Sequence, residues 1–246
     1  MDISKRLKTV AHAVTPGKRM ADVGTDHGYV PIYLVKAGRC PGAIAMDINV
    51  GPLERAVQHI EEEGLSHIIS TRLSDGMKEL KQGEVDTVVI AGMGGDLMCR
   101  ILTAREDLME DGLEFVLQPQ SEWFKVRHLL HDHGYAIRKE WFLKEDGKYY
   151  VIMKTEPGQQ KFDEEWQYSY GAFLEEDCVS IYQEYLEKEK KKKVEISAGI
   201  VSQIKKEASL MEDQNTKNEN NLLKRKQRVE ELEGEIAQID ARLQAL

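Results

Sequence analysis

The chain has 246 residues, enough for one domain of about 150 residues with its own core and a further segment. No apolar run is long enough to cross a bilayer, which excludes a transmembrane helix. The first residues lack the apolar stretch of a secretory signal. Cys40, Cys99 and Cys178 are odd in number and far apart, so they predict neither disulfides nor a metal cluster and indicate a reducing cytoplasm.

The net charge is −9 at pH 7. Up to Pro157 the chain has 20 basic and 24 acidic residues, and after it 14 basic and 19 acidic residues. Because neither part is basic, the composition excludes a nucleic-acid coat that binds by bulk charge. Any binding to RNA has to come from the placement of individual Lys and Arg residues.

Short apolar runs alternate with amphipathic segments through the first part of the chain. Apolar or β-branched runs predict strands, and apolar residues at helical spacing predict helices. The predicted strands cover residues 19–24, 43–48, 68–74, 87–91, 114–118, 135–142 and 148–155, and the predicted helices cover 29–38, 51–63 and 122–133. Strands separated by helices predict a parallel, doubly wound sheet. The Asp-Gly turn at 146–147 predicts a hairpin that makes the last strand antiparallel.

A heptad-like pattern marks the end of the chain. Apolar residues recur there at alternate spacings of three and four, at Val229, Leu232, Ile236, Ile239, Leu243 and Leu246. This spacing is typical of a coiled coil, and its upstream continuation through Val201 and Ile204 predicts a helical hairpin. The turn of the hairpin lies either in the polar segment 212–221 or at the lysine run 190–193, and the sequence leaves both open.

The chain divides near Pro157, beyond which no proline occurs. After it, a stripe of Trp166, Tyr170, Leu174, Cys178, Ile181 and Tyr185 predicts a further helix that packs in the core of the hairpin. We therefore expect two domains, an α/β domain of residues 1–157 and a C-terminal coiled-coil domain of residues 158–246.

The most informative motif is Ala21-Asp22-Val23-Gly24-Thr25-Asp26-His27-Gly28-Tyr29, between a predicted strand and a predicted helix. A glycine at a strand end lets the backbone turn tightly and approach a ligand. The spacing Gly24-x-x-x-Gly28 differs from the G-x-G-x-x-G of a dinucleotide site, because Asp26 stands between the glycines. A carboxylate there would repel a diphosphate and attract a cationic or amino group.

Three further loops follow predicted strands and are expected at the same edge of the sheet. Asp47, followed by Ile48, is placed to accept hydrogen bonds from ribose hydroxyls, with a helix cap as the alternative. Asp75, in Asp75-Gly76, can accept from the exocyclic amine of adenine, although Asp-Gly is also an ordinary turn. The glycines of Ala91-Gly92-Met93-Gly94-Gly95 allow close approach to a ligand, with a flexible turn as the alternative.

These motifs, with Leu117-Gln118-Pro119-Gln120 and the coiled-coil pattern, resemble the bacterial tRNA (adenine-22-N1)-methyltransferase family, the TrmK family of class I S-adenosylmethionine-dependent methyltransferases. The resemblance covers nearly the whole chain and implies a Rossmann-like sheet of seven strands with a two-helix coiled-coil tail. It implies methyl transfer to N1 of an adenine, position 22 in the D-arm of tRNA. It also implies that S-adenosylmethionine binds at Asp22, Gly24, Thr25, Gly28, Asp47, Ile48, Asp75, Gly76, Ala91, Gly92, Met93 and Gly94.

The chemical step is expected to involve Asp26, His27 and Tyr29. Adenine N1 carries a lone pair, so we expect an in-line displacement without prior deprotonation. Asp26 is the first candidate to stabilise the charge that develops on the base or to accept an N6 proton, with positioning of the cofactor or loop as an equal alternative. His27 is expected to contact the cofactor or the base, and Tyr29 to stack on a flipped adenine; packing is the alternative for both.

The expected partner is tRNA, held by phosphate contacts from Lys and Arg residues. The candidates are Lys5, Arg6, Lys8, Lys18, Arg19, Arg127 and Lys148, and Gln118 is a candidate to read an adenine edge. We expect a cytoplasmic monomer without metal or membrane attachment, with a dimer through the coiled coil as the alternative. Other functions stay open: methylation of a different RNA site, an NAD-dependent oxidoreductase, or a non-catalytic RNA-binding protein.

Overall fold

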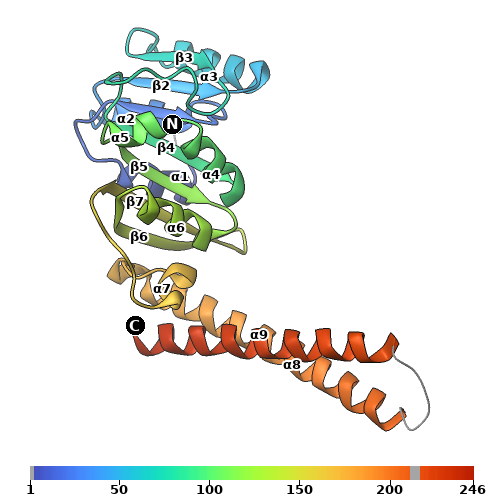
Figure 1. Ribbon diagram of the computed structural model, residues 1–246. Helices are drawn as coiled ribbons and strands as arrows, with labels where there is room; N and C mark the ends of the chain where they lie inside the picture. The colour runs from blue at the N-terminus through green and yellow to red at the C-terminus, as the bar shows by residue number, and fades with distance from the viewer. Residues whose placement is uncertain (1–2, 211–216) are drawn as a thin grey trace.

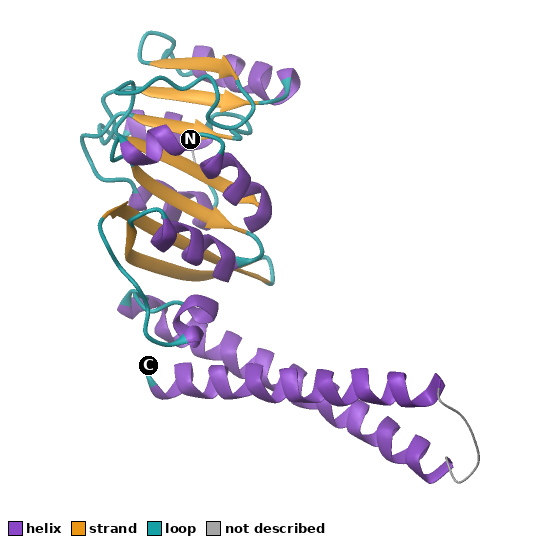
Figure 2. Ribbon diagram, in the orientation of Figure 1, coloured by secondary structure: helices purple, strands orange, loops and turns teal. Residues whose placement is uncertain are grey.

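The computed structural model describes residues 3–210 and 217–246. An α/β part with a seven-stranded sheet lies on one end of a pair of long helices (Figures 1 and 2). The strands are β1 (Met20–Val23), β2 (Ala43–Asp47), β3 (Ile69–Leu73), β4 (Thr87–Met93), β5 (Glu114–Pro119), β6 (Tyr135–Glu145) and β7 (Lys148–Pro157). The helices are α1 (Lys5–Ala13), α2 (Tyr29–Lys36), α3 (Val50–Glu62), α4 (Gly95–Thr103), α5 (Glu106–Glu110), α6 (Trp123–Asp132), α7 (Glu165–Tyr170), α8 (Val179–Leu210) and α9 (Lys217–Gln244), with a 3-10 turn at Glu176–Cys178.

The order of the strands creates a ligand-binding edge. They lie in the order β3-β2-β1-β4-β5-β7-β6, and β1 pairs in parallel with both β2 and β4. The chain therefore moves outward from β1 in one direction and from β4 in the other. Parallel α/β sheets open a crevice at such a reversal, at the carboxyl ends of the strands. The motifs that follow β1 and β4 meet there.

The expected antiparallel hairpin is confirmed. Strand β7 pairs antiparallel with both β5 and β6, so it lies between them and β6 forms the sheet edge. Because β7 runs against the parallel strands, its first residue, Lys148, lies at the same edge as the ends of β1 and β4. The turn of the hairpin thus reaches the ligand-binding edge.

Apolar side chains cover both faces of the sheet. On one face, Val10 of α1 and Ile32 of α2 belong to a buried cluster with β1 and β2 residues. On the other, Met98 of α4 and Leu130 of α6 join a larger cluster. Each predicted strand and helix of the α/β part is present. The sequence patterns missed α1, whose buried residues are few, and α4 and α5.

The C-terminal helices α8 and α9 pack against each other, as the apolar pattern predicts. Leu232 and Ile239 of that pattern are buried. The expectation of a turn at the lysine run 190–193 is wrong, because these residues lie within α8. Lys190 and Lys193 there pair with Asp240 and Glu235 of α9. The other expected turn, 212–221, includes residues 212–216, which lie outside the described residues.

The single helix expected from Trp166 to Tyr185 is also wrong. Helix α7 ends at Tyr170, and Gly171 after it adopts a left-handed φ of 79°. Leu174 then forms a β-bridge with Glu140 of β6. Apolar residues of this segment and of both long helices join the cluster under the sheet. The core therefore continues across Pro157, and the division into two domains stays a prediction. In the part of the chain described, no helix is long and apolar enough to span a membrane.

Candidate functional site

The loop after β1 forms the floor of the site. The backbone N–H groups of Gly24 and Thr25 both donate to the carbonyl of Met46 at 2.8 Å, which ties this loop to β2. Gly24 has a φ of 77°. A Cβ atom at Gly24 would lie 2.1 Å from the terminal methyl group of Met93, after β4. The left-handed backbone conformation favours glycine here, and any larger side chain would also displace the Met93 side chain.

Two carboxyl groups stand at the ends of neighbouring strands. Asp22, in β1, is buried and accepts a 2.7 Å hydrogen bond from the Thr25 hydroxyl. Burial, with a smaller contribution from the charge of Asp47, raises the pKa of Asp22 to about 6, although the bond from Thr25 opposes this. Asp47, at the end of β2, accepts a 2.7 Å bond from the N–H of Asn49. These two carboxyl groups are therefore placed to bind a cationic ligand.

A cleft of about 540 Å³ opens above this floor. It is bounded by the loops after β1 and β4, by α1 and by the β6–β7 hairpin. Its lining residues are Ser4, Arg6, Leu7, Asp22, Gly24, Asp26, Tyr29, Val30, Ala91, Gly92, Gln120, Glu145, Asp146 and Tyr150. The structure therefore brings together six residues expected from the motifs: Asp22, Gly24, Asp26, Tyr29, Ala91 and Gly92.

Sequence reasoning missed the wall that α1 supplies. The Arg6 guanidinium donates to Oε1 of Gln118 at 2.9 Å, and the N–H of Gly92 donates to the same oxygen at 3.2 Å. The Arg6 guanidinium also lies 5.4 Å from the Tyr150 ring centroid. Gln118 is fully buried, and its amide group donates to Pro119. The expectation that Gln118 reads a base edge is wrong, because its buried side-chain oxygen accepts bonds from Arg6 and Gly92 and its amide group donates to the carbonyl of Pro119.

Three aromatic rings stack beside the cleft. The rings of His27 and Tyr29 are 5.1 Å apart and nearly parallel, and the His59 ring of α3 lies 5.2 Å from His27 and 5.4 Å from Tyr29. His59 Nδ1 lies 3.0 Å from the carbonyl oxygen of His27, a residue with a left-handed φ of 68°. The stack holds Tyr29 at the cleft. His59 was not expected, because nothing in the local sequence of α3 distinguishes it.

Asp26 points its carboxylate toward open solvent at the mouth of the cleft. Its side chain is 65% exposed and accepts a 2.9 Å hydrogen bond from Arg55 of α3. His27 Nε2 lies 3.3 Å from the same carboxylate oxygen. Asp26 lines the cleft, so its carboxyl group is placed to face a base that gains positive charge.

The other predicted cofactor residues lie around the cleft rather than in its lining. Gly28 begins α2 against Ala56, and Gly94 precedes α4. Asp75 is exposed and paired with Lys78 at 2.5 Å, and Gly76 packs on Ile101. Ile48, next to Asp47, is 58% exposed.

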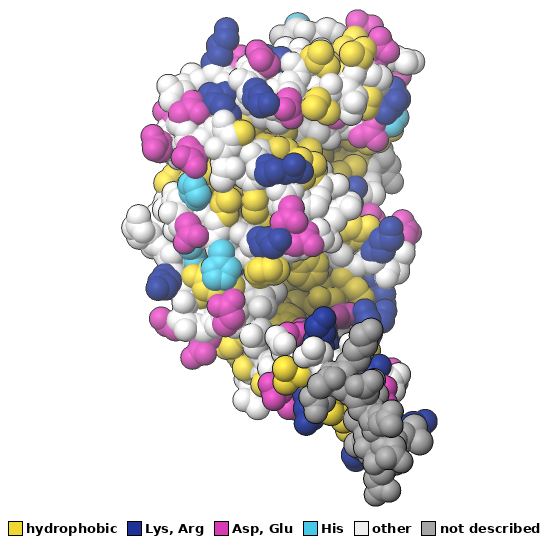
Figure 3. All heavy atoms as spheres, turned by 45° about the vertical axis from the view of Figure 1, so that its right-hand side comes forward, with side chains coloured by type: hydrophobic (Ala, Val, Ile, Leu, Met, Phe, Trp, Pro, Cys, Tyr) yellow, Lys and Arg dark blue, Asp and Glu magenta, His cyan; other side chains and the backbone are white. Residues whose placement is uncertain are grey.

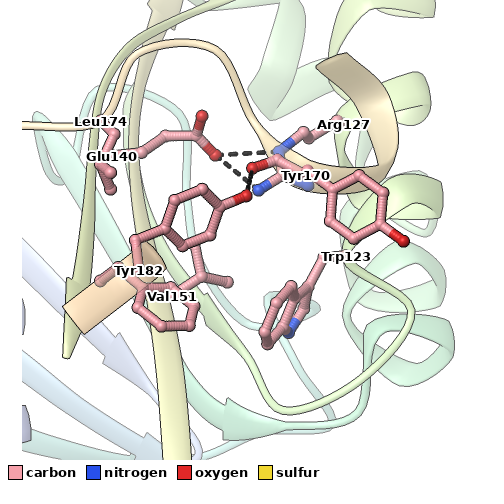
Figure 4. Close-up of a pocket in the computed structure, with 8 residues that line it drawn as sticks. Trp123, Arg127, Glu140, Val151, Tyr170, Leu174 and Tyr182 are labelled. Atoms are coloured by element: carbon pink, nitrogen blue, oxygen red, sulfur yellow. Dashed lines mark hydrogen bonds and ion pairs between the residues drawn. The ribbon is translucent and has the colours of Figure 1, made fainter. Parts of the chain in front are cut away.

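The basic residues expected to contact RNA divide into three groups. The expectation that Arg127 contacts RNA is wrong. Its side chain is 1% exposed and pairs with Glu140 of β6 at 2.7 Å (Figure 4). Lys18 and Arg19 precede β1, at the edge opposite the cleft, where they pair with Glu114 and Asp86. Arg6 lines the cleft, and Lys5 and Lys8 lie with it in α1. Lys148 lies in the hairpin at the same edge.

The arrangement fits a nucleoside that carries a cation. Gly24 lines the cleft without a side chain, Asp22 and Asp47 supply acceptors at adjacent strand ends, and Ile48 offers an exposed apolar side chain for a base. S-adenosylmethionine has these three features: a ribose, an adenine and positive charge near the methyl group. Within residues 3–210 and 217–246, no cluster of three or more His, Cys, Asp or Glu side chains is arranged to hold a metal ion.

Comparison with known proteins also indicates a methyltransferase. A family model described as a methyltransferase domain matches residues 3–153. A tRNA (adenine(22)-N(1))-methyltransferase of Bacillus subtilis (strain 168) is 41% identical over 160 residues, 65% of this chain and 67% of the relative. The crystal structure of the B. subtilis m1A22 tRNA methyltransferase TrmK has a TM-score of 0.81 at 31% identity and covers 98% of both chains. M. capricolum TrmK in complex with S-adenosyl-homocysteine has a TM-score of 0.74 at 28% identity, covering 96% of this chain and 99% of that one.

Proposed function

We propose that this chain, which belongs to the tRNA (adenine(22)-N(1))-methyltransferase family, transfers a methyl group from S-adenosylmethionine to N1 of an adenine in tRNA. The observation that carries the proposal is the cleft at the ends of β1 and β4, which Gly24 lines without a side chain and where the Asp22 carboxyl group is placed to attract a cation. The B. subtilis relative is named for adenine 22, and we propose the same nucleotide, in the D-arm.

Four groups of this chain would hold the methyl donor. Asp47 is placed at the end of β2 for the ribose hydroxyls, and Ile48 for the adenine ring. Asp22 and the backbone at Gly24 are placed for the positively charged methionine part. Bound there, S-adenosylmethionine supplies a methyl group on a positively charged sulfur. The proposed set also includes residues that contact the donor or shape the three other loops: Thr25, Gly28, Asp75, Gly76, Ala91, Gly92, Met93 and Gly94.

The base needs little chemical help from the protein. As the N1–carbon bond forms, the sulfur–carbon bond breaks and its electron pair stays on sulfur, so the positive charge passes to the adenine. Holding the reacting atoms in line can supply about 7 to 11 kcal/mol of the barrier. Asp26 is placed either to stabilise the charge on the methylated base or to accept a proton from its N6.

The aromatic stack beside the cleft suits a base that has left its helix. Tyr29 lines the cleft with its ring held against His27 and His59. An adenine unstacked from tRNA needs such a flat partner to recover its lost stacking. We therefore assign Tyr29 and His27 to the base and Asp26 to its charge.

We further propose that the protein works in the cytoplasm as a monomer without a metal ion. The helices α8 and α9 bury part of their apolar seam against each other, which supports a monomer over a coiled-coil dimer. Three free thiols, of Cys40, Cys99 and Cys178, suit a reducing compartment.

A methyl-transfer assay tests the proposed reaction. Purified protein, labelled S-adenosylmethionine and an unmodified tRNA transcript are incubated, and the RNA is digested to nucleosides. We expect the label in 1-methyladenosine. Label in N6-methyladenosine, in another nucleoside, or in none would contradict the proposal.

A further inference from the structure

A second hollow lies beside the cleft, between the β6–β7 hairpin and the first turns of α8. It has a volume of about 350 Å³ and is lined by Gln120, Trp123, Lys148, Tyr149, Tyr150 and Tyr185. We call it the aromatic groove. Gln120 and Tyr150 also line the cleft, so the two hollows adjoin each other. Figure 3 shows hydrophobic side chains in a hollow above the helix pair, with Lys and Arg side chains near it.

Aromatic rings from three separate elements form this groove. The rings of Tyr149, in β7, and Tyr185, in α8, lie 5.1 Å apart and tilted by 57°. The Trp123 ring, at the start of α6, lies 5.8 Å from Tyr185. All three side chains are half-buried, so each keeps part of its surface toward the groove. Aromatic surfaces of this kind are the platforms on which proteins stack unpaired bases.

The charge of the groove suits a phosphate backbone. Its six lining residues include Lys148 and no carboxylate, in a chain whose net charge is −9. The ammonium groups of Lys144 and Lys188 lie 5.3 Å and 5.6 Å from the Tyr149 ring centroid. Glu184 balances one of them, because it accepts bonds from Lys144 at 2.5 Å and from the Tyr149 hydroxyl at 2.9 Å.

We propose that the aromatic groove binds an unpaired nucleotide of the RNA substrate that neighbours the target adenine. Its base stacks on Tyr185 with Tyr149 at its edge, and its phosphate contacts Lys148. This proposal rests on the proposed function, since extrusion of the target base leaves its neighbours without a stacking partner. The shared wall of Gln120 and Tyr150 places the two nucleotides in adjoining hollows. Helix α8 therefore takes part in substrate binding through Tyr185.

Two pairs of variants test the groove from the protein side. Tyr185→Leu removes the ring and keeps apolar volume, whereas Tyr185→Phe keeps the ring. We expect the dissociation constant for tRNA to rise about tenfold for Tyr185→Leu and to stay within twofold for Tyr185→Phe. Lys148→Ala should weaken binding and reduce the slope of log affinity against log salt by about one. Lys81→Ala, an exposed lysine before β4, is the matched control and should change neither.

An abasic substitution tests the groove from the RNA side. tRNA transcripts lacking the base on the 5′ or on the 3′ side of the target adenine are titrated with wild-type protein and with Tyr185→Leu. We expect one of the two abasic transcripts to bind wild-type protein about tenfold more weakly. The same transcript should lose no further affinity with Tyr185→Leu, because the two changes remove the same contact.

The outcomes separate this proposal from the proposed function. Two results would show that the groove holds no neighbouring base while wild-type protein still methylates tRNA. In the first, Tyr185→Leu binds tRNA as tightly as wild-type protein. In the second, the affinity lost through Tyr185→Leu adds fully to the affinity lost through each abasic substitution. If Tyr185→Leu instead changes self-association in sedimentation while tRNA affinity is kept, the occupant is a second protein chain and the proposal is wrong. If wild-type protein methylates no tRNA at all, the proposed function itself fails.

Discussion

The hydroxyl group of Thr25 donates a 2.7 Å hydrogen bond to the carboxylate of Asp22, at the floor of the cleft. Burial raises the pKa of this carboxyl group to about 6, and the hydroxyl group limits the rise. Asp22 therefore changes its charge just below neutral pH. A positively charged ligand favours the ionised form, so the affinity for such a ligand and the protonation of Asp22 are linked.

We expect the affinity for S-adenosylmethionine to fall as the pH drops below about 6, because protonated Asp22 carries no charge to attract the cation. The dissociation constant should rise by up to about tenfold per pH unit below that value. Calorimetric titration across this range measures it. Asp22→Asn should bind weakly with no such step. Thr25→Val, which removes the stabilising hydroxyl group, should move the step to higher pH. An affinity independent of pH in wild-type protein would exclude this role for Asp22.

Asp47 is expected to hold the ribose of the methyl donor. Asp47→Ala should raise the dissociation constant of S-adenosylmethionine at least about tenfold, since hydrogen bonds to a charged group contribute about 1.5–3 kcal/mol each. Asp47→Asn keeps an acceptor for the N–H of Asn49 and should lose less. Asp132→Asn, an exposed residue at the end of α6, should bind as wild type. Equal affinity of Asp47→Ala and wild-type protein would remove Asp47 from the site.

Asp26 is expected to act on the rate of methyl transfer rather than on donor binding. Asp26→Asn should lower the single-turnover rate about 100-fold, because the neutral amide cannot balance the charge on the base. Arg55→Ala should have a smaller effect, since it releases the carboxylate from its 2.9 Å partner but keeps the charge. Asp107→Asn, another exposed carboxylate paired with an arginine, is the matched control. A wild-type rate in Asp26→Asn with weakened donor binding would favour a positioning role.

Arg127 is expected to be a structural residue, because it forms a buried pair with Glu140. Arg127→Met leaves that carboxylate without its partner and should lower the free energy of unfolding by about 3–5 kcal/mol. Urea denaturation measures the change. Arg138→Met removes an exposed arginine of β6, paired with Glu156, and should cost less than about 1 kcal/mol. If Arg127→Met is as stable as wild-type protein but binds tRNA more weakly, Arg127 contacts RNA and the structural role is wrong.

The sequence predicted the sheet and its main loops because those signals are local. Buried parallel strands such as Thr87–Met93 are continuous apolar runs, and the glycines that follow them lie at the carboxyl edge whatever the packing elsewhere. Helix α1 carries no comparable signal, so the contribution of Arg6 to the cleft was not visible. The same limit explains Arg127: its sequence neighbours do not show that Glu140, thirteen residues away, lies close enough to pair with it.

Arg55 and His59 show the limit within the site itself. Both lie on the predicted helix 51–63, whose apolar face was correctly placed, and both reach the Gly24 loop from a distance of about thirty residues. Their roles depend on how α3 packs on β2 and β3. Contacts of this kind are set by tertiary structure, and a single sequence shows only the residues that they join.

Position mapping on one tRNA tests the central claim most directly. A transcript with adenine at D-arm position 22 and a second with guanine there are incubated with protein and S-adenosylmethionine, then copied by reverse transcription. A methyl group on N1 blocks Watson–Crick pairing, so we expect a stop next to that adenine in the first transcript and none in the second. A stop elsewhere, equal stops in both transcripts, or full-length copies despite methyl incorporation would contradict N1 methylation at this nucleotide.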